Sequence, residues 1–312
     1  MKKYILKRCL YMIATLFIII TITFFLMRMI PGDPLANMAK ALPEQTKANF
    51  YAKFGLDKPL IYQYFTYMKN LLRFDLGESV VFAGRSVSGT IASTSPVSGM
   101  VGGIALVIGV VIGVGLGIIA ALYKNRWPDY LVMIIAILGV TIPVFVLASL
   151  MQYFFSVKLG MFPPSGWGSP KYLVLPVLAL CLGPIASYAR YVKSSMLDTL
   201  EQDYVLTARA KGLSETKVIS RHVLRNSMLP IVTMLAGSVV GIFTGAFVTE
   251  RMFSIPGIGF YYIDSISNND YTMILGTTIF YAVLFVVMQL VVDLLYVLVD
   301  PRIRITNDSV TE

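Results

Sequence analysis

The sequence predicts an all-α integral membrane protein with six transmembrane helices. Of its 312 residues, 14% are charged and 56% are hydrophobic, and the mean hydropathy is +0.73. Soluble domains usually contain about 25% charged residues, so the composition indicates a membrane protein. Six apolar blocks are long enough to cross a hydrocarbon core of about 30 Å as helices. They span residues 9–29, 97–122, 130–155, 173–189, 231–248 and 273–299.

The first and fourth blocks need separate justification. Four basic residues precede the first block, as they would in a signal peptide. Its apolar run is longer than the hydrophobic core of a signal peptide, and Pro31-Gly-Asp-Pro34 follows it in place of a cleavage site of small residues. We therefore expect a helix that is retained in the mature protein. The fourth block is short and contains Pro176 and Pro184. Neighbouring helices can satisfy the backbone groups that proline leaves unbonded.

Lysine and arginine counts indicate that both termini are cytoplasmic. With the N-terminus inside, the inside segments contain fifteen of these residues and the two short outside loops contain three. Residues 31–96 contain seven more, but loops longer than about 60 residues largely escape the rule. This asymmetry accounts for the net charge of +9. No basic patch with interleaved aromatic residues favours a nucleic acid partner.

The expected division of the chain has three parts. Residues 1–30 form the N-terminal transmembrane helix, and residues 31–96 form a small extracytoplasmic domain rich in aromatic residues. Residues 97–312 form the transmembrane core, with a cytoplasmic loop over residues 190–230. The extracytoplasmic domain either caps the helix bundle or offers a docking face to an external partner, and both interpretations stay open.

Two of the predicted spans contain glycines at helical spacing, which let another backbone approach closely. We expect packing within this chain, with a specific subunit interface as the alternative. The sixth block contains an isolated carboxylate, Asp293, which either makes a structural polar contact or serves transport. The glycines are Gly99, Gly103, Gly109, Gly113 and Gly117 in the second block, and Gly237, Gly241 and Gly245 in the fifth.

The chain carries no motif for catalysis or for phosphate binding. A Gly-x4-Gly-Lys-Ser/Thr loop, a His-Glu-x-x-His motif, a nucleophile elbow and a Cys-x-x-Cys pair are all absent. His222 is the single histidine, which excludes a multi-histidine metal site. We therefore expect no enzyme and no cofactor in this chain. Uphill transport would need energy from a partner or from an ion gradient.

A basic segment over residues 204–225, between the fourth and fifth blocks, is predicted to form two short helices joined by a tight turn. Gly212 stands where a glycine in the left-handed conformation would end the first helix. Ser214 has the position of an N-cap for the second helix. Leu213 and Val218 have the spacing of a hydrophobic staple.

The second predicted helix carries Lys217, Arg221 and Arg225 at intervals of four, which places them in one basic stripe. A solvated hairpin that serves only topology, or one held against anionic lipid heads, would share this charge. The caps and the small residues Ala208 and Ala210 favour a rigid element that fits into a groove of a partner protein.

The letters of this segment resemble a known motif. Thr207-Ala-Arg-Ala-Lys-Gly-Leu213, followed by Arg221-His222, Arg225-Asn226 and Leu229-Pro230, looks like the coupling loop of ABC importer permeases in its peptide-transporter form. The glutamate of the general Glu-Ala-Ala pattern would fall at Leu206 and is absent, and Leu-Pro falls later than in that pattern. Both departures suit the oligopeptide/dipeptide branch.

Further motifs along the chain extend the resemblance to the B-type membrane subunit of oligopeptide/dipeptide ABC permeases. Each motif alone is weak, whereas the ordered set is specific. The motifs are Pro31-Gly-Asp-Pro34, Phe54-Gly-Leu-Asp57 with Pro59, Asp75-Leu-Gly77, Gly166-Trp-Gly168, Pro256-Gly-Ile-Gly259, Asp270-Tyr271 and Asp300-Pro-Arg302.

The resemblance implies a type I ABC importer permease fold in a prokaryotic cytoplasmic membrane. It implies a second homologous permease, two cytoplasmic ATPases that bind ATP and magnesium, and an extracytoplasmic binding protein that delivers peptide. Arg209 and Lys211 would meet carboxylates of the ATPase, and the two alanines would allow close approach. The implied ATPase-coupling residues are Tyr204, Thr207, Ala208, Arg209, Ala210, Lys211, Gly212, Leu213, Arg221 and Arg225.

Three alternative functions remain from the sequence. A permease for nickel or a metallophore would keep the family and change the cargo. A secondary transporter driven by an ion gradient would need more charged residues within the spans than Asp293. A membrane scaffold without transport activity would not explain the paired helix signals around Gly212.

Overall fold

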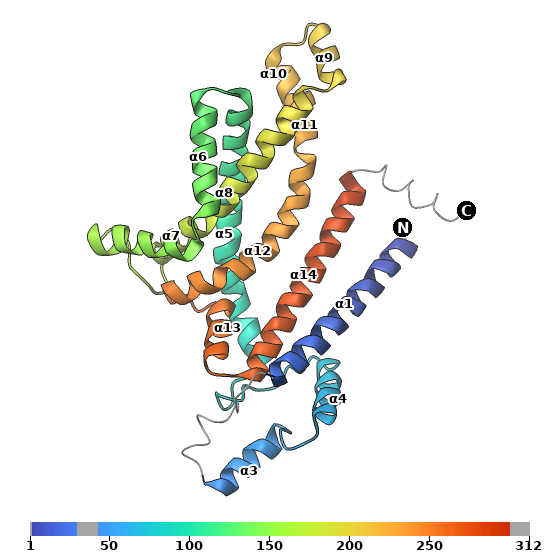
Figure 1. The fold of residues 1–312 in the computed structure, drawn as a ribbon, viewed down its shortest axis with the longest axis vertical. Helices are drawn as coiled ribbons and strands as arrows, with labels where there is room; N and C mark the ends of the chain where they lie inside the picture. Colours follow the sequence, from blue (N-terminus) through green and yellow to red (C-terminus); the bar gives the residue numbers. More distant parts are fainter. Residues whose placement is uncertain (1, 30–42, 300–312) are drawn as a thin grey trace. The chain divides into compact units, whose positions relative to one another are not determined.

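The computed structural model describes residues 2–29 and 43–299. Apart from one isolated bridge between Glu78 and Ser86, the regular elements of this part are helices (Figure 1). The chain divides into two compact units, which are described separately. Unit 1 contains Met1–Ser98 and Ile255–Val286, and unit 2 contains Gly99–Ser254 and Val287–Glu312. The predicted division at residues 30 and 96 remains a prediction.

Unit 1 is held together by an aromatic cluster between three helices. Phe24, Tyr64 and Leu275 are buried together, and the Thr21 and Tyr64 hydroxyl groups lie 2.8 Å apart. The rings of Phe24 and Tyr64 meet edge to face at 5.4 Å. Unit 1 is built from α1 (Lys2–Met29), α3 (Glu44–Lys53), α4 (Leu60–Leu71), α13 (Ile258–Ser267) and the first parts of α5 (Val87–Leu122) and α14 (Tyr271–Val299).

A buried carboxylate fixes the start of α14 to the loop that precedes α5. Asp270 is 1% exposed. It accepts a hydrogen bond from the Ser79 hydroxyl and bonds from the Val80 and Met273 amides, both at 3.2 Å. Several donors on one carboxylate compensate for its burial. The Asp270-Tyr271 motif therefore has a structural role in unit 1.

Unit 2 is organised around α8 (Lys171–Leu200), whose Tyr188, Val192 and Met196 are fully buried. Helices α5, α6 and α12 pack against α8 (Figure 1). An ion pair of 2.5 Å between Lys193 and the buried Asp129 ties α8 to α6. The further elements of this unit are α6 (Trp127–Thr141), α7 (Val144–Met151), η1 (Gln152–Lys158), α9 (Asp203–Ala210), α10 (Glu215–Val218), η2 (Ile219–Val223), α11 (Leu224–Ser227) and α12 (Leu229–Phe253).

Three glycines of the α5 ladder, Gly109, Gly113 and Gly117, pack against α8, as expected for contacts within the chain, whereas a Cβ on Gly103 would meet no atom within 4 Å. A Cβ on Gly113 would lie 2.8 Å from the Ile185 carbonyl oxygen, and one on Gly117 would lie 2.7 Å from that of Ala189. The ladder of α12 behaves differently. A Cβ on Gly237 or Gly241 would meet no atom within 4 Å. Close packing of ladder glycines against another helix of unit 2 is therefore shown for α5.

Among the described residues, four helices are long and apolar enough to cross a membrane, or five if one bent helix pair counts as a span. The four are Leu6–Met29, Val87–Leu122, Lys171–Leu200 and Tyr271–Val291. Helix α12 covers the fifth predicted block, but the structure does not describe many of the side chains of this helix. The side chain of Asp293 also lies outside it, so its role stays a prediction.

The third predicted block is not one straight helix. Trp127–Thr141 and Val144–Lys158 are bent by 102° relative to each other. The break falls at Ile142, which is extended, and Pro143. Proline disfavours the helical conformation in the residue before it. The fourth block, predicted to be short, is instead one 30-residue helix with Pro176 and Pro184 inside it.

Candidate functional site

The predicted basic hairpin exists, and we call residues 203–227, from α9 to α11, the hairpin. Helix α9 ends at Ala210, and Gly212 follows with φ +76°. The Gly212 amide donates to the Arg209 carbonyl at 2.9 Å, and the Leu213 amide donates to the Ala208 carbonyl at 3.4 Å. These two bonds form a Schellman motif, which needs a left-handed residue at this position. The predicted role of Gly212 in the turn is confirmed.

The second arm of the hairpin begins as expected in its backbone but not in its side chains. Ser214 has the N-cap conformation, with φ −61° and ψ 145°, yet its side chain makes no capping bond. Val218 is fully buried, whereas Leu213 is 38% exposed. The predicted staple therefore contributes only Val218 to the core. The arm continues as a π-helical turn, Ile219–Val223, which the sequence reasoning missed.

The interior of the hairpin is continuous with the core around α8. One side-chain bond closes the hairpin, and a second attaches it to α8. The Asn226 amide donates to the Tyr204 hydroxyl at 3.0 Å, and the Ser195 hydroxyl of α8 donates to the Ser227 carbonyl at 3.0 Å. The hairpin and α8 therefore share one core. The shared core includes Val205, Ala208, Val218 and Val223 of the hairpin and Tyr188, Val192 and Met196 of α8.

The structure buries Ala208 and pairs Arg209 within the chain, while their implied contacts with an ATPase stay a prediction. Ala208 is 4% exposed and packs inside the hairpin, so it is not part of an outer surface of small residues. Ala210 is exposed. The guanidinium of Arg209 binds Glu215 within the chain, at 2.6 Å and 3.2 Å between its nitrogens and the two carboxylate oxygens. Arg209 thus links the two arms across the Gly212 turn.

The Arg209–Glu215 pair persists at neutral pH. Hydrogen bonding to Arg209 holds the pKa of Glu215 below its usual value, and the same bond raises the pKa of Arg209. A carboxylate with a lowered folded-state pKa contributes stability above its unfolded pKa and loses it as the pH falls through the folded value. The pair is exposed, so its contribution to the free energy of unfolding is small.

The outer surface of the hairpin combines apolar and basic side chains. Leu206 is 52% exposed and Tyr204 is 41% exposed, and Thr207 is exposed beside them. Sequence reasoning missed Leu206 as a surface residue. Its signal was available, because Val205 and Ala208 are three apart on one face of α9 and Leu206 cannot share that face. The basic residues Lys211, Lys217, Arg221 and Arg225 are all exposed.

This arrangement suits contact with a partner protein. Exposed apolar and aromatic side chains are typical of protein interfaces, and basic side chains complement an acidic partner surface. Within the described residues, no group of three or more His, Cys, Asp or Glu side chains is placed to hold a metal ion.

Comparison with known protein families gives two matches that together cover nearly the whole chain. Residues 113–305 match the family described as "Binding-protein-dependent transport system inner membrane component". Residues 1–99 match the N-terminal region described for membrane components of such systems. The first match includes the entire hairpin.

Individual relatives are similar over their full lengths. The dipeptide transport system permease protein DppB of Bacillus subtilis is 46% identical over 305 residues, covering 98% of this chain and 99% of that protein. The oligopeptide transport system permease protein OppB of Escherichia coli K12 is 42% identical over 306 residues, covering 97% and 100%.

Two solved structures share the fold at low identity. A methionine ABC transporter, MetNI, in an inward-facing conformation has a TM-score of 0.55 and 17% identity, covering 68% of this chain and 96% of its own. An amino acid ABC transporter crystallised with histidines has a TM-score of 0.53 and 14% identity, covering 67% and 93%.

Proposed function

Because this chain belongs to the family of binding-protein-dependent transport system inner membrane components, we propose that it is a permease subunit of an ATP-driven importer of dipeptides or oligopeptides. The peptide cargo is supported by the relatives named as dipeptide and oligopeptide permeases, which match almost end to end. No described feature favours nickel, a metallophore or an ion gradient as cargo or energy source.

The observation that carries the proposal is the attachment of the hairpin. The outer surface of the hairpin is exposed, while its interior belongs to the same core as α8. We infer that a cytoplasmic ATPase binds the outer surface of the hairpin. When two ATPases close on ATP, the hairpin moves with its ATPase, and α8 moves with the hairpin. Such coupling requires contacts that differ between the two states. ATP and magnesium would then be bound by the ATPases, because this chain has no phosphate-binding loop.

The proposed topology has six spans with both termini in the cytoplasm. The four long apolar helices, the bent pair and α12 together supply six membrane elements. The asymmetry of lysine and arginine supports the orientation, which puts the hairpin inside. Residues 31–96 then lie outside, where an extracytoplasmic peptide-binding protein would dock.

A second, homologous permease would complete the translocation path. The α12 ladder supports this partner, because Gly237 has open space where a Cβ would stand. Small residues on a helix face permit close contact with another helix in a membrane. The α5 glycines Gly109, Gly113 and Gly117 are not available for this role, since α8 already covers them.

Reconstitution tests the function directly. The chain would be co-purified with its second permease and ATPases, placed in liposomes, and supplied with its binding protein and a labelled dipeptide. We expect uptake that requires ATP and survives collapse of proton and sodium gradients. Uptake driven by a gradient without ATP would contradict the proposal, as would a binding protein that retains a nickel chelate and no peptide.

A further inference from the structure

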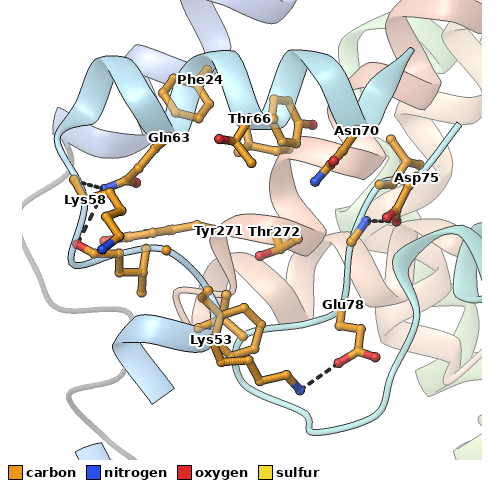
Figure 2. A pocket seen from close by; sticks show the side chains of 18 of the residues that line it. Phe24, Lys53, Lys58, Gln63, Thr66, Asn70, Asp75, Glu78, Tyr271 and Thr272 are labelled. Atoms are coloured by element: carbon orange, nitrogen blue, oxygen red, sulfur yellow. Dashed lines mark hydrogen bonds and ion pairs between the residues drawn. The ribbon is translucent and has the colours of Figure 1, made fainter. Parts of the chain in front are cut away.

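Unit 1 contains a pocket of about 710 Å³, lined by α1, α4, residues 52–58 and the start of α14. Figure 2 shows Gln63, Thr66 and Asn70 projecting from α4, across from Tyr271 and Thr272. Small-molecule sites usually have volumes of roughly 300–1,000 Å³. All described lining residues belong to unit 1. The pocket is therefore a feature of one compact unit and is large enough for a short peptide.

Three polar side chains around this pocket have a buried atom with no hydrogen-bond partner. They are the Arg28 Nε, the Tyr67 hydroxyl and the Gln63 Oε1. Burial also raises the pKa of the Tyr67 phenol, and a neutral phenol can donate a hydrogen bond. A buried donor or acceptor without a hydrogen bond costs free energy. These atoms therefore favour a ligand that forms hydrogen bonds with them after small side-chain rotations. Two of the three can donate and one accepts.

Among the described lining residues, Arg28 is the cation without a carboxylate partner, and the lining also includes the Asp75 carboxylate, which accepts a hydrogen bond from the Gly77 amide at 2.8 Å. Lys53 lies 3.0 Å from Glu78 at the pocket edge (Figure 2), and Lys58 lies 3.1 Å from Asp57. Among the described residues, Arg28 has no carboxylate within ion-pair distance, and its guanidinium stacks on the Phe24 ring at 5.4 Å. Arginine binds carboxylates with particular strength because its donors are fixed in one plane.

We propose that this pocket holds the C-terminal end of the transported peptide, with Arg28 and Tyr67 donating to the terminal carboxylate. Gln63 Oε1 accepts from a peptide N–H in the same complex. This inference rests on the proposed peptide transport. A phosphate headgroup of a lipid would satisfy the two donors, but it would offer no amide N–H to Gln63. The mixed set of donors and acceptor therefore fits a peptide end better than a phosphate.

The test compares one tripeptide with its C-terminal amide. Initial uptake rates of both are measured in the complete reconstituted transporter, for the wild type and for Arg28→Gln, Tyr67→Phe and Arg73→Gln. Loss of a charge-assisted hydrogen bond should lower the acid-to-amide ratio of rates about tenfold in Arg28→Gln. A smaller fall in the same direction is expected for Tyr67→Phe.

Arg73→Gln is the matched control, since Arg73 is exposed and is not among the lining residues. Its ratio should equal that of the wild type. Any preference of the binding protein for the acid or the amide affects all variants equally, because all of them use the same binding protein. It therefore cancels when their acid-to-amide ratios are compared. If Arg28→Gln does not assemble, Tyr67→Phe decides by itself.

An acid-to-amide ratio that is unchanged in the assembled variants overturns the inference. So does an equal loss for acid and amide that occurs only in vesicles containing phosphatidylglycerol, since this assigns the pocket to a lipid headgroup. Failure of the wild type to import either peptide would instead contradict the proposed function, so the two failures are distinguishable.

Discussion

Replacing Gly212 by tryptophan should leave the protein inserted and assembled but abolish ATP-driven peptide uptake. Gly212 has φ +76°, where a non-glycine residue costs roughly 1–2 kcal/mol. A Cβ there would meet no atom within 4 Å, so the chain itself has room for a larger side chain. The bulk would instead project into the surface that we assign to the ATPase. The measurement is ATP hydrolysis and peptide uptake in the same proteoliposomes.

Gly212→Asn is the control for backbone conformation. Asparagine enters the left-handed region more readily than other non-glycine residues and is much smaller than tryptophan. We expect this variant to retain most of the uptake, with hydrolysis and uptake still linked. Normal uptake by Gly212→Trp would contradict the coupling role of the turn. Equal loss in both variants would assign the effect to the turn conformation and not to the partner surface.

Replacing Gly117 by alanine should destabilise unit 2 by about 1–3 kcal/mol, the usual cost of overpacking a tight contact. The new Cβ would lie 2.6 Å from the Val192 Cβ and 2.7 Å from the Ala189 carbonyl oxygen. The second of these is a backbone atom, which cannot rotate away, so α5 and α8 must separate. The measurement is thermal or denaturant unfolding of the detergent-purified protein, with its amount in the membrane as a second readout.

Gly115→Ala on the same helix is the matched control. A Cβ at Gly115 would meet no atom within 4 Å. Alanine is favoured over glycine in a helix by up to about 1 kcal/mol, so this variant should be neutral or slightly stabilised. If the Gly117→Ala and Gly115→Ala variants have the same stability to heat or denaturant, this contradicts the close contact between α5 and α8.

Local signals in the sequence predicted the hairpin well. Gly212 ends α9 in the expected conformation, and Pro230 lies in the first turn of α12. These features depend on residues a few positions apart, whose backbone preferences act locally. The family resemblance was confirmed by matches over nearly the whole chain.

Features that depend on distant residues were harder to predict. The burial of Ala208 and the pairing of Arg209 with Glu215 follow from how the two arms fold onto each other and onto α8. The bend at Pro143 had a local signal, but the apolar run around it hid the break. The pocket beside Arg28 joins α1, α4 and α14, and no periodicity within one segment could predict it.

The central claim is that the outer surface of the hairpin contacts the ATPase. A photoreactive amino acid in place of the exposed Leu206 tests it most directly, with one in place of the exposed Phe154 of η1 as the control. In membranes containing the assembled transporter, we predict a covalent product with the ATPase subunit from position 206 and none from position 154. A position 206 probe that captures no ATPase in a transporter that still imports peptide would contradict the account.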